Sequence, residues 1–267
     1  MLDFCSFEAN RTMLIDSHAH LDLDDFKDDR NHVVKRAIKG GLTHIISVGI
    51  DAASSVNALD LAREYGPVFA SVGYHPHNAD RCDRSDLDDL AMMVSDPKIV
   101  AWGEIGLDFY RGYSAVENQT DVFRHQLHLA HDLKLPVIIH DREAHDQAYE
   151  ILRKMGKRER NGVIHCFSGD IDLAAAFIEL GFFISIPGTV TYKNASQVRE
   201  VASSIPIDRM LIETDAPFLT PVPKRGKRNE PLYVTFTAME IARLRSMEFE
   251  DVALKTSENA KLLFGLP

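Results

Sequence analysis

Short apolar stretches, each followed by an amphipathic helical pattern, alternate along most of this 267-residue chain. Eight of these stretches are rich in β-branched or aromatic residues, which predicts strands. Their carboxyl ends fall near residues 16, 49, 74, 104, 140, 165, 186 and 215, and two helical patterns, about 233–245 and 249–264, close the chain. Strict alternation implies parallel strands joined by right-handed crossovers. The pattern therefore predicts an α/β fold, a single-domain (β/α)8 TIM barrel spanning residues 13–267.

An open, doubly wound sheet is the alternative to the barrel. Such a sheet gathers its ligand site at one switch point, whereas polar residues here follow predicted strands throughout the chain. The closed barrel is therefore favoured. No glycine-rich phosphate loop follows the first predicted strand, so we expect no nucleotide cofactor.

The composition constrains the partners and the cellular compartment expected for the protein. Its formal net charge of −10 excludes wrapping duplex DNA with its general surface, so any contact with nucleic acid must be local. Three cysteines without paired spacing indicate a reducing compartment, and we expect a cytoplasmic monomer. No apolar stretch is long enough to cross a bilayer, so no membrane partner is expected. Residues 1–12 are interpreted as a disordered leader or a misassigned start before Met13.

Histidines and carboxylates follow five of the predicted strands. His18 and His20 are two residues apart, so on extended backbone both imidazoles point to the same side. Alone, this pair could equally be two surface histidines. The other candidates follow later strands, and they are Glu104, His140, His165 and Asp215. Because all strand ends of a closed barrel face one rim, the sequence predicts a metal site at the carboxyl-terminal rim.

Six donors exceed what a single zinc ion with an open position needs. Two divalent ions sharing Glu104 fit better, and imidazole favours zinc, manganese, nickel or iron, with magnesium possible for activity. Two ions, two carboxylates and one hydroxide sum to about +1, which would attract an anion. Two such ions can activate a hydroxide for a phosphoryl displacement.

Other polar residues are predicted to lie near this rim. His75 and His77 follow the third strand and could contact a phosphate or orient a substrate. Asp108 is either a partner that orients a histidine or a helix cap, and we count it among the residues around the substrate.

The segment 220–231 after the last strand is the one concentrated basic stretch. It could be a solvated loop stiffened by prolines. Alternatively, Lys224, Arg225 and Arg228 contact phosphates beside the metals, which is a common task of such side chains. A few cations on an acidic protein favour binding the end of a DNA strand over coating a duplex.

Seven motifs together resemble the TatD family of metal-dependent hydrolases, in the amidohydrolase-type barrel superfamily. They are Asp16-Ser17-His18-Ala19-His20-Leu21, Gly73-Tyr74-His75-Pro76-His77, Gly103-Glu104-Ile105-Gly106-Leu107-Asp108, Val137-Ile138-Ile139-His140, His165-Cys166-Phe167-Ser168-Gly169, Glu213-Thr214-Asp215-Ala216-Pro217 and Arg225-Gly226-Lys227-Arg228-Asn229-Glu230-Pro231. The resemblance implies that the six candidate donors are metal ligands. It also implies a deoxyribonuclease acting as a 3′ to 5′ exonuclease on single-stranded DNA.

Three functions therefore follow as hypotheses. The first is a phosphodiesterase, specifically the deoxyribonuclease, in which Asp215 or Glu104 takes the proton of the attacking water. The second is an amide or ester hydrolase, such as a D-aminoacyl-tRNA deacylase. Related barrels with such activities often bridge their metals through a carboxylated lysine, and Glu104 at the strand-four position favours the nuclease. The third, a non-catalytic binding barrel, is disfavoured by the intact donor set.

Overall fold

The computed structural model describes residues 13–157 and 160–267, so the expectation for residues 1–12 lies outside the described residues. Eight parallel strands form one sheet in the order β1 to β8. Their bounds are β1 Leu14–Ala19, β2 Leu42–Val48, β3 Val68–Val72, β4 Ile99–Asp108, β5 Val137–Arg142, β6 Gly162–Ile164, β7 Phe182–Ile186 and β8 Met210–Ile212. The predicted (β/α)8 barrel is confirmed.

The sheet closes between its first and last strands just beyond the end of β8. Ala19 and Ala216 form a parallel bridge there. The Asp215 amide donates to the His18 carbonyl oxygen at 2.9 Å, and the His20 amide donates to the Ala216 carbonyl oxygen at 2.7 Å. The backbone bonds that close the barrel therefore fix three of the candidate ligands relative to one another.

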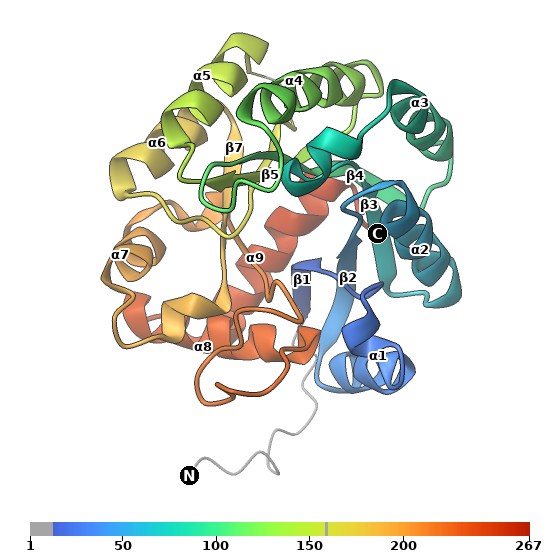
Figure 1. Cartoon of the computed structure of the whole chain (residues 1–267). Coiled ribbons are helices and arrows are strands. Elements are labelled where there is room, and N and C mark those ends of the chain that lie inside the picture. Colours follow the sequence, from blue (N-terminus) through green and yellow to red (C-terminus); the bar gives the residue numbers. More distant parts are fainter. Residues whose placement is uncertain (1–12, 158–159) are drawn as a thin grey trace.

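Helices surround the sheet on its outer face (Figure 1). Their bounds are α1 Arg30–Lys39, α2 Ala52–Glu64, α3 Arg84–Met93, α4 Val116–Asp132, α5 His145–Met155, α6 Ile171–Glu179, α7 Ser196–Ser204, α8 Val234–Arg245 and α9 Phe249–Phe264. Apolar residues on the inner sides of these helices pack against the outward side chains of the strands to form the larger core. Among the described residues, no helix combines the length and apolar character needed to span a membrane.

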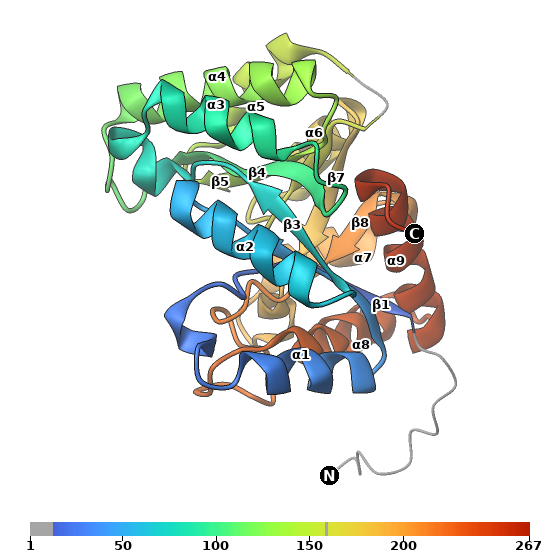
Figure 2. The same cartoon turned by 90° about the vertical axis from the view of Figure 1, so that its right-hand side faces the viewer.

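The last helix closes one end of the barrel. Leu263 and Phe264 of α9 are buried against the inward-facing residues of the strands, including Ile15 and Phe183. Figure 2 shows α9 at the end of the barrel opposite the segments that follow the strands. The carboxyl-terminal rim therefore remains the open end.

One glycine allows β4 and β5 to lie close together beside the rim. Gly106 pairs with His140 and has a φ of +146°, a region that residues with a side chain rarely adopt. A Cβ atom there would overlap the carbonyl oxygen of His140. This close approach places Glu104 on β4 next to His140 on β5.

Candidate metal centre

The predicted donors come from five strands and meet at the open end of the barrel. Their positions differ in detail from strand termini, because β1, β4 and β5 extend further than predicted. His18, Glu104 and His140 lie within strands, whereas His165 follows β6 directly and Asp215 lies three residues beyond β8. The rim is thus formed partly by the last turns of strand and partly by the segments that leave them.

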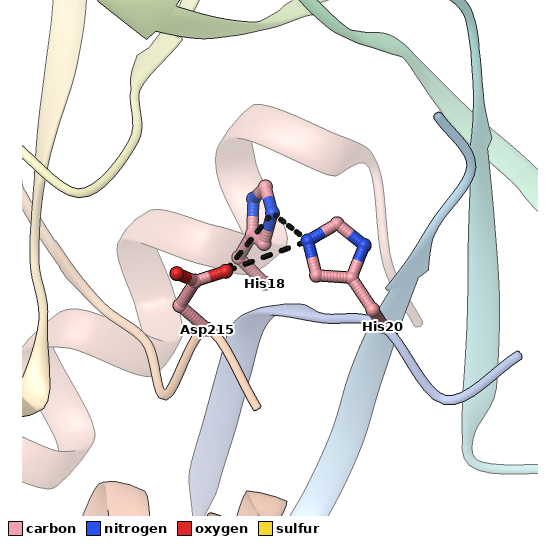
Figure 3. Close-up of side chains that lie close together, drawn as sticks. All are labelled: His18, His20 and Asp215. Atoms are coloured by element: carbon pink, nitrogen blue, oxygen red, sulfur yellow. Dashed lines mark hydrogen bonds and ion pairs between the residues drawn. The ribbon is translucent and has the colours of Figure 1, made fainter. Parts of the chain in front are cut away.

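His18, His20 and Asp215 form one group of donors (Figure 3). The two Nε2 atoms lie 3.2 Å apart. Asp215 Oδ1 lies 3.4 Å from Nε2 of His20 and 3.8 Å from Nε2 of His18. Behind this group, Nδ1 of His20 lies 3.1 Å from the carbonyl oxygen of Val48, which directs Nε2 toward the other donors.

Glu104 lies between this group and a second group of donors, His140 and His165. Its Oε1 is 2.8 Å from Nδ1 of His140 and 2.8 Å from Nε2 of His165. Its Oε2 is 3.3 Å from Nε2 of His18 and 3.6 Å from Nε2 of His20. A single carboxylate therefore presents one oxygen to each group.

This donor set fits divalent cations. Imidazole nitrogens crowd together here, with Nδ1 of His140 only 3.3 Å from Nε2 of His165. His18 and Glu104 are almost completely buried, so the charges of this cluster are poorly solvated. Such crowding of lone pairs is costly unless protons or cations lie between them, and imidazole with carboxylate is a typical set for zinc, manganese, nickel or iron.

Both carboxylates are ionised in this environment. Burial opposes ionisation of Glu104, but the facing imidazoles of His165, His75 and His18 hold its pKa well below the usual value. Burial likewise opposes ionisation of Asp215, and the imidazoles of His20, His18 and His165 together outweigh it to lower the pKa. Two anionic groups are therefore available at neutral pH to hold cations or accept a proton.

The imidazoles divide into two kinds. Burial, together with repulsion from His165, lowers the pKa of His18. Burial also acts against protonation of His20 and His165, but nearby carboxylates raise the pKa of His20 to about 9 and that of His165 well above its usual value. Because a metal ligand must be unprotonated, cation binding would displace protons from this cluster.

Asp108 supports His140 from behind. Its Oδ2 is 3.1 Å from Nε2 of His140 and 2.8 Å from Nε2 of His77. Its Oδ1 accepts bonds from the amides of Tyr110 and Arg111. With its side chain 1% exposed and both oxygens occupied, Asp108 orients His140 and is not open to direct contact with a substrate.

His75 faces Glu104 from the segment after β3. Its Nδ1 accepts a hydrogen bond from the His77 amide, so in the neutral ring the proton is on Nε2, 3.3 Å from Glu104 Oε1. Burial, the largest influence, lowers its pKa to about 3. His75 therefore directs a neutral N–H group into the centre, while the His77 ring lies further out.

Two buried carboxylates that the sequence analysis left without a role also support the centre. Glu213 Oε1 lies 3.4 Å from Nδ1 of His165. Asp16 accepts bonds from the amide and the hydroxyl of Thr214, at 2.9 and 2.6 Å, and from the His18 amide at 3.3 Å. Each stands two residues from a candidate ligand on the same strand or the segment after it. This spacing of two residues was the signal in the sequence that could have identified both carboxylates.

The cationic side chains of the basic segment after β8 make different kinds of contact. Both terminal nitrogens of Arg228 donate to the Asp29 carboxylate at 2.8 Å, so this guanidinium holds the segment against the rest of the protein. Arg225 lies over the Tyr192 ring at 4.1 Å, and the Lys224 ammonium lies 5.6 Å from a neighbouring tyrosine ring. Among the described residues, neither Lys224 nor Arg225 forms an ion pair, so both can meet an anion.

The barrel and its rim of histidines and carboxylates define a metal-dependent hydrolase. The chain matches the TatD-related DNase family over residues 15–265. The chain belongs to the TatD family.

Relatives cover nearly the whole chain. It is 42% identical to the uncharacterised metal-dependent hydrolase YabD of Bacillus subtilis, over 95% of this chain and 100% of that protein. It is 36% identical to the 3′-5′ ssDNA/RNA exonuclease TatD of Erwinia amylovora, over 95% of this chain and 100% of the relative. The crystal structure of YJJV, a TatD homologue from Escherichia coli, superimposes with a TM-score of 0.90 and 33% identity, covering 95% and 98% of the two chains.

Proposed function

We propose that the protein is a deoxyribonuclease that removes nucleotides from the 3′ end of single-stranded DNA. One observation carries this proposal: Glu104 presents one oxygen to each of two donor groups, which is how a carboxylate shared by two cations is placed. Two-metal centres are typical of phosphodiester hydrolysis. Relatives named 3′-5′ ssDNA/RNA exonuclease support the same bond and the same direction.

The six donors divide between two cation positions. His18, His20 and Asp215 would hold one ion, and His140 and His165 the other, with Glu104 common to both. Two divalent ions held there would favour ionisation of a water and neutralise the phosphate oxygens during displacement. We expect zinc, manganese, nickel or iron to bind most tightly because the donors are mainly imidazoles.

Asp215 is the better placed of the two carboxylates to take the proton. Its side chain is 14% exposed, against 3% for Glu104, whose two oxygens both face imidazoles. The low pKa of Asp215 keeps it ionised at neutral pH, ready to accept a proton from the attacking water. The N–H group of His75 faces Glu104 Oε1, on the side of His140 and His165, and can donate to a phosphate oxygen bound there.

The substrate would be held by cations of the segment after β8. Lys224 and Arg225 lack carboxylate partners among the described residues and can contact phosphates. Arg228 contributes indirectly, because its pair with Asp29 anchors the segment that carries them.

The test is a panel of substrates offered to metal-stripped protein that is re-supplied with one ion at a time. Single-stranded DNA, duplex DNA, RNA and simple esters are compared, and the DNA is labelled at either its 5′ or its 3′ end. We expect fastest hydrolysis of single-stranded DNA, with early release of the 3′ label as a mononucleotide. Faster hydrolysis of carboxylic esters than of any nucleic acid would overturn the proposal in favour of an acyl hydrolase.

A further inference from the structure

The segment between β4 and α4 carries an unusual group of exposed side chains beside the metal centre. Tyr110 is 53% exposed and Tyr113 is 64% exposed, although large rings are normally buried. Figures 1 and 2 place this segment at the same end of the barrel as the segment after β8. The exposed rings therefore lie at the open rim.

A chain of contacts joins this segment to the candidate ligands. The Tyr113 ring packs edge-on against His77, with centroids 4.7 Å apart. His77 bonds to Asp108, and Asp108 in turn bonds to His140. Two side chains, those of His77 and Asp108, thus link Tyr113 to the donor His140. Much of the Tyr113 side chain faces solvent.

Two guanidinium groups lie beside the neighbouring ring. The Arg142 guanidinium lies 4.2 Å from the Tyr110 ring centroid, and that of Arg111 lies 5.5 Å from it. Within residues 13–157 and 160–267, neither of them forms an ion pair, in contrast to Arg228 with Asp29. Both arginine side chains are exposed, so each guanidinium can form an ion pair with a phosphate.

We propose that Tyr113, Tyr110, Arg111 and Arg142 form a subsite for the unpaired strand next to the scissile phosphate. We call these four residues the aromatic rim. A nucleobase stacks on the exposed face of Tyr113, and the guanidiniums of Arg111 and Arg142 bind the phosphates beside it. A base inside a duplex has both faces covered, so the aromatic rim selects single-stranded substrates.

The proposal rests on the nucleolytic function proposed above, but its test is a measurement of binding. A labelled thymidine oligonucleotide with phosphorothioate linkages, which resist cleavage, is bound to the metal-loaded full chain, and anisotropy gives the Kd. We expect Tyr113→Ala to raise Kd by about 5- to 150-fold, the range of one lost stacking contact. Tyr113→Phe, which keeps the ring, should bind as the parent does.

Replacing one base at a time by an abasic residue makes the test specific. At one position near the 3′ end, base removal should weaken binding to the parent but leave Kd of Tyr113→Ala unchanged, because the stacking contact is already lost. Equal weakening of both proteins at every position would overturn the stacking role.

The arginines are tested by salt dependence. Arg142→Gln should make the slope of log binding constant against log salt shallower by about 0.7, the value for one phosphate contact on a single strand. Arg209→Gln is the matched control, because Arg209 lies over the Phe183 ring at the closed end of the barrel and should leave the slope unchanged.

These outcomes separate the two proposals. If the parent binds the oligonucleotide with the expected losses in the variants but does not cleave its phosphodiester counterpart, the aromatic rim stands and the nuclease function fails. If cleavage occurs and Tyr113→Ala and Arg142→Gln both bind as the parent does, the aromatic rim is refuted and the nuclease function stands. Failure of the parent to bind also refutes the aromatic rim.

Discussion

Asp108→Asn should weaken cation binding although Asp108 is not itself a proposed ligand. The carboxylate accepts from Nε2 of His140, so in the neutral ring, the form that binds a cation, Nδ1 is unprotonated and faces Glu104 at 2.8 Å. In the variant the amide oxygen keeps the two backbone bonds of Oδ1, so the NH2 group faces His140 and donates to its Nε2. The ring must then carry its proton on Nδ1, where it blocks coordination.

The expected loss follows from removing one orienting partner of a ligand histidine. Such changes weaken metal affinity about 10- to 100-fold, which corresponds to about 1.4–2.8 kcal/mol. The assay is competition with a chelator for zinc or manganese, and urea unfolding of the metal-free protein checks that the fold is retained.

Asp141→Asn provides the matched control. Asp141 adjoins His140 in sequence and is also buried, but its carboxylate bonds to His145 at 2.8 Å on the next helix. This variant should bind metal as the parent does. The reasoning is refuted if Asp108→Asn keeps the parent's affinity, or if both variants lose affinity equally.

Three more outcomes are expected. Asp215→Asn should lower kcat about 10²- to 10⁴-fold, the usual contribution of a general base, while anisotropy shows oligonucleotide binding retained; an unchanged kcat would exclude the proton role. Replacing Lys224 and Arg225 together by Gln should make the salt slope of oligonucleotide binding shallower by about 1.4, two contacts at 0.7 each, and an unchanged slope would remove both from the binding surface. Burial, aided by the charges of two lysines, lowers the pKa of His44 from 6.5 to about 4. As the pH falls from 6.5 to about 4, His44 takes up a proton in the unfolded state but not in the folded state, so the free energy of unfolding decreases. Since the His44 side chain is only partly buried, the contribution is about 1–2 kcal/mol after allowing for solvent screening. Urea unfolding at pH 7 and pH 4.5 should show a smaller difference for His44→Gln, and equal differences in both proteins would contradict this.

The sequence was sufficient for the barrel and for bringing the candidate donors together. Parallel strands deliver their carboxyl ends to one rim, so residues as far apart as His18 and Asp215 could be placed together from strand order alone. The details of strand length were less accessible. Glu104 and His140 lie inside their strands because the Gly106 close approach lets β4 and β5 continue past the predicted ends.

The contacts that side chains around the rim make with distant parts of the chain could not be predicted from the sequence. Arg228 pairs with Asp29, 199 residues earlier in the chain, so its charge is engaged in a way that the local basic segment did not reveal. Tyr113 lies in the connection between β4 and α4, whereas Arg142 is the last residue of β5, and their exposure at the rim depends on how the segments around them pack. Strand periodicity specifies which side of the sheet a residue faces, but not the side chain that it meets across two loops.

Metal content measured on the gently purified full chain, by elemental analysis against protein concentration, tests the central claim most directly. The account predicts about two divalent transition ions per chain, falling below one in Glu104→Gln, because this carboxylate is shared by both positions. Fewer than one ion per chain in the parent after saturation with zinc or manganese, or two ions in the variant, would contradict a centre built around Glu104.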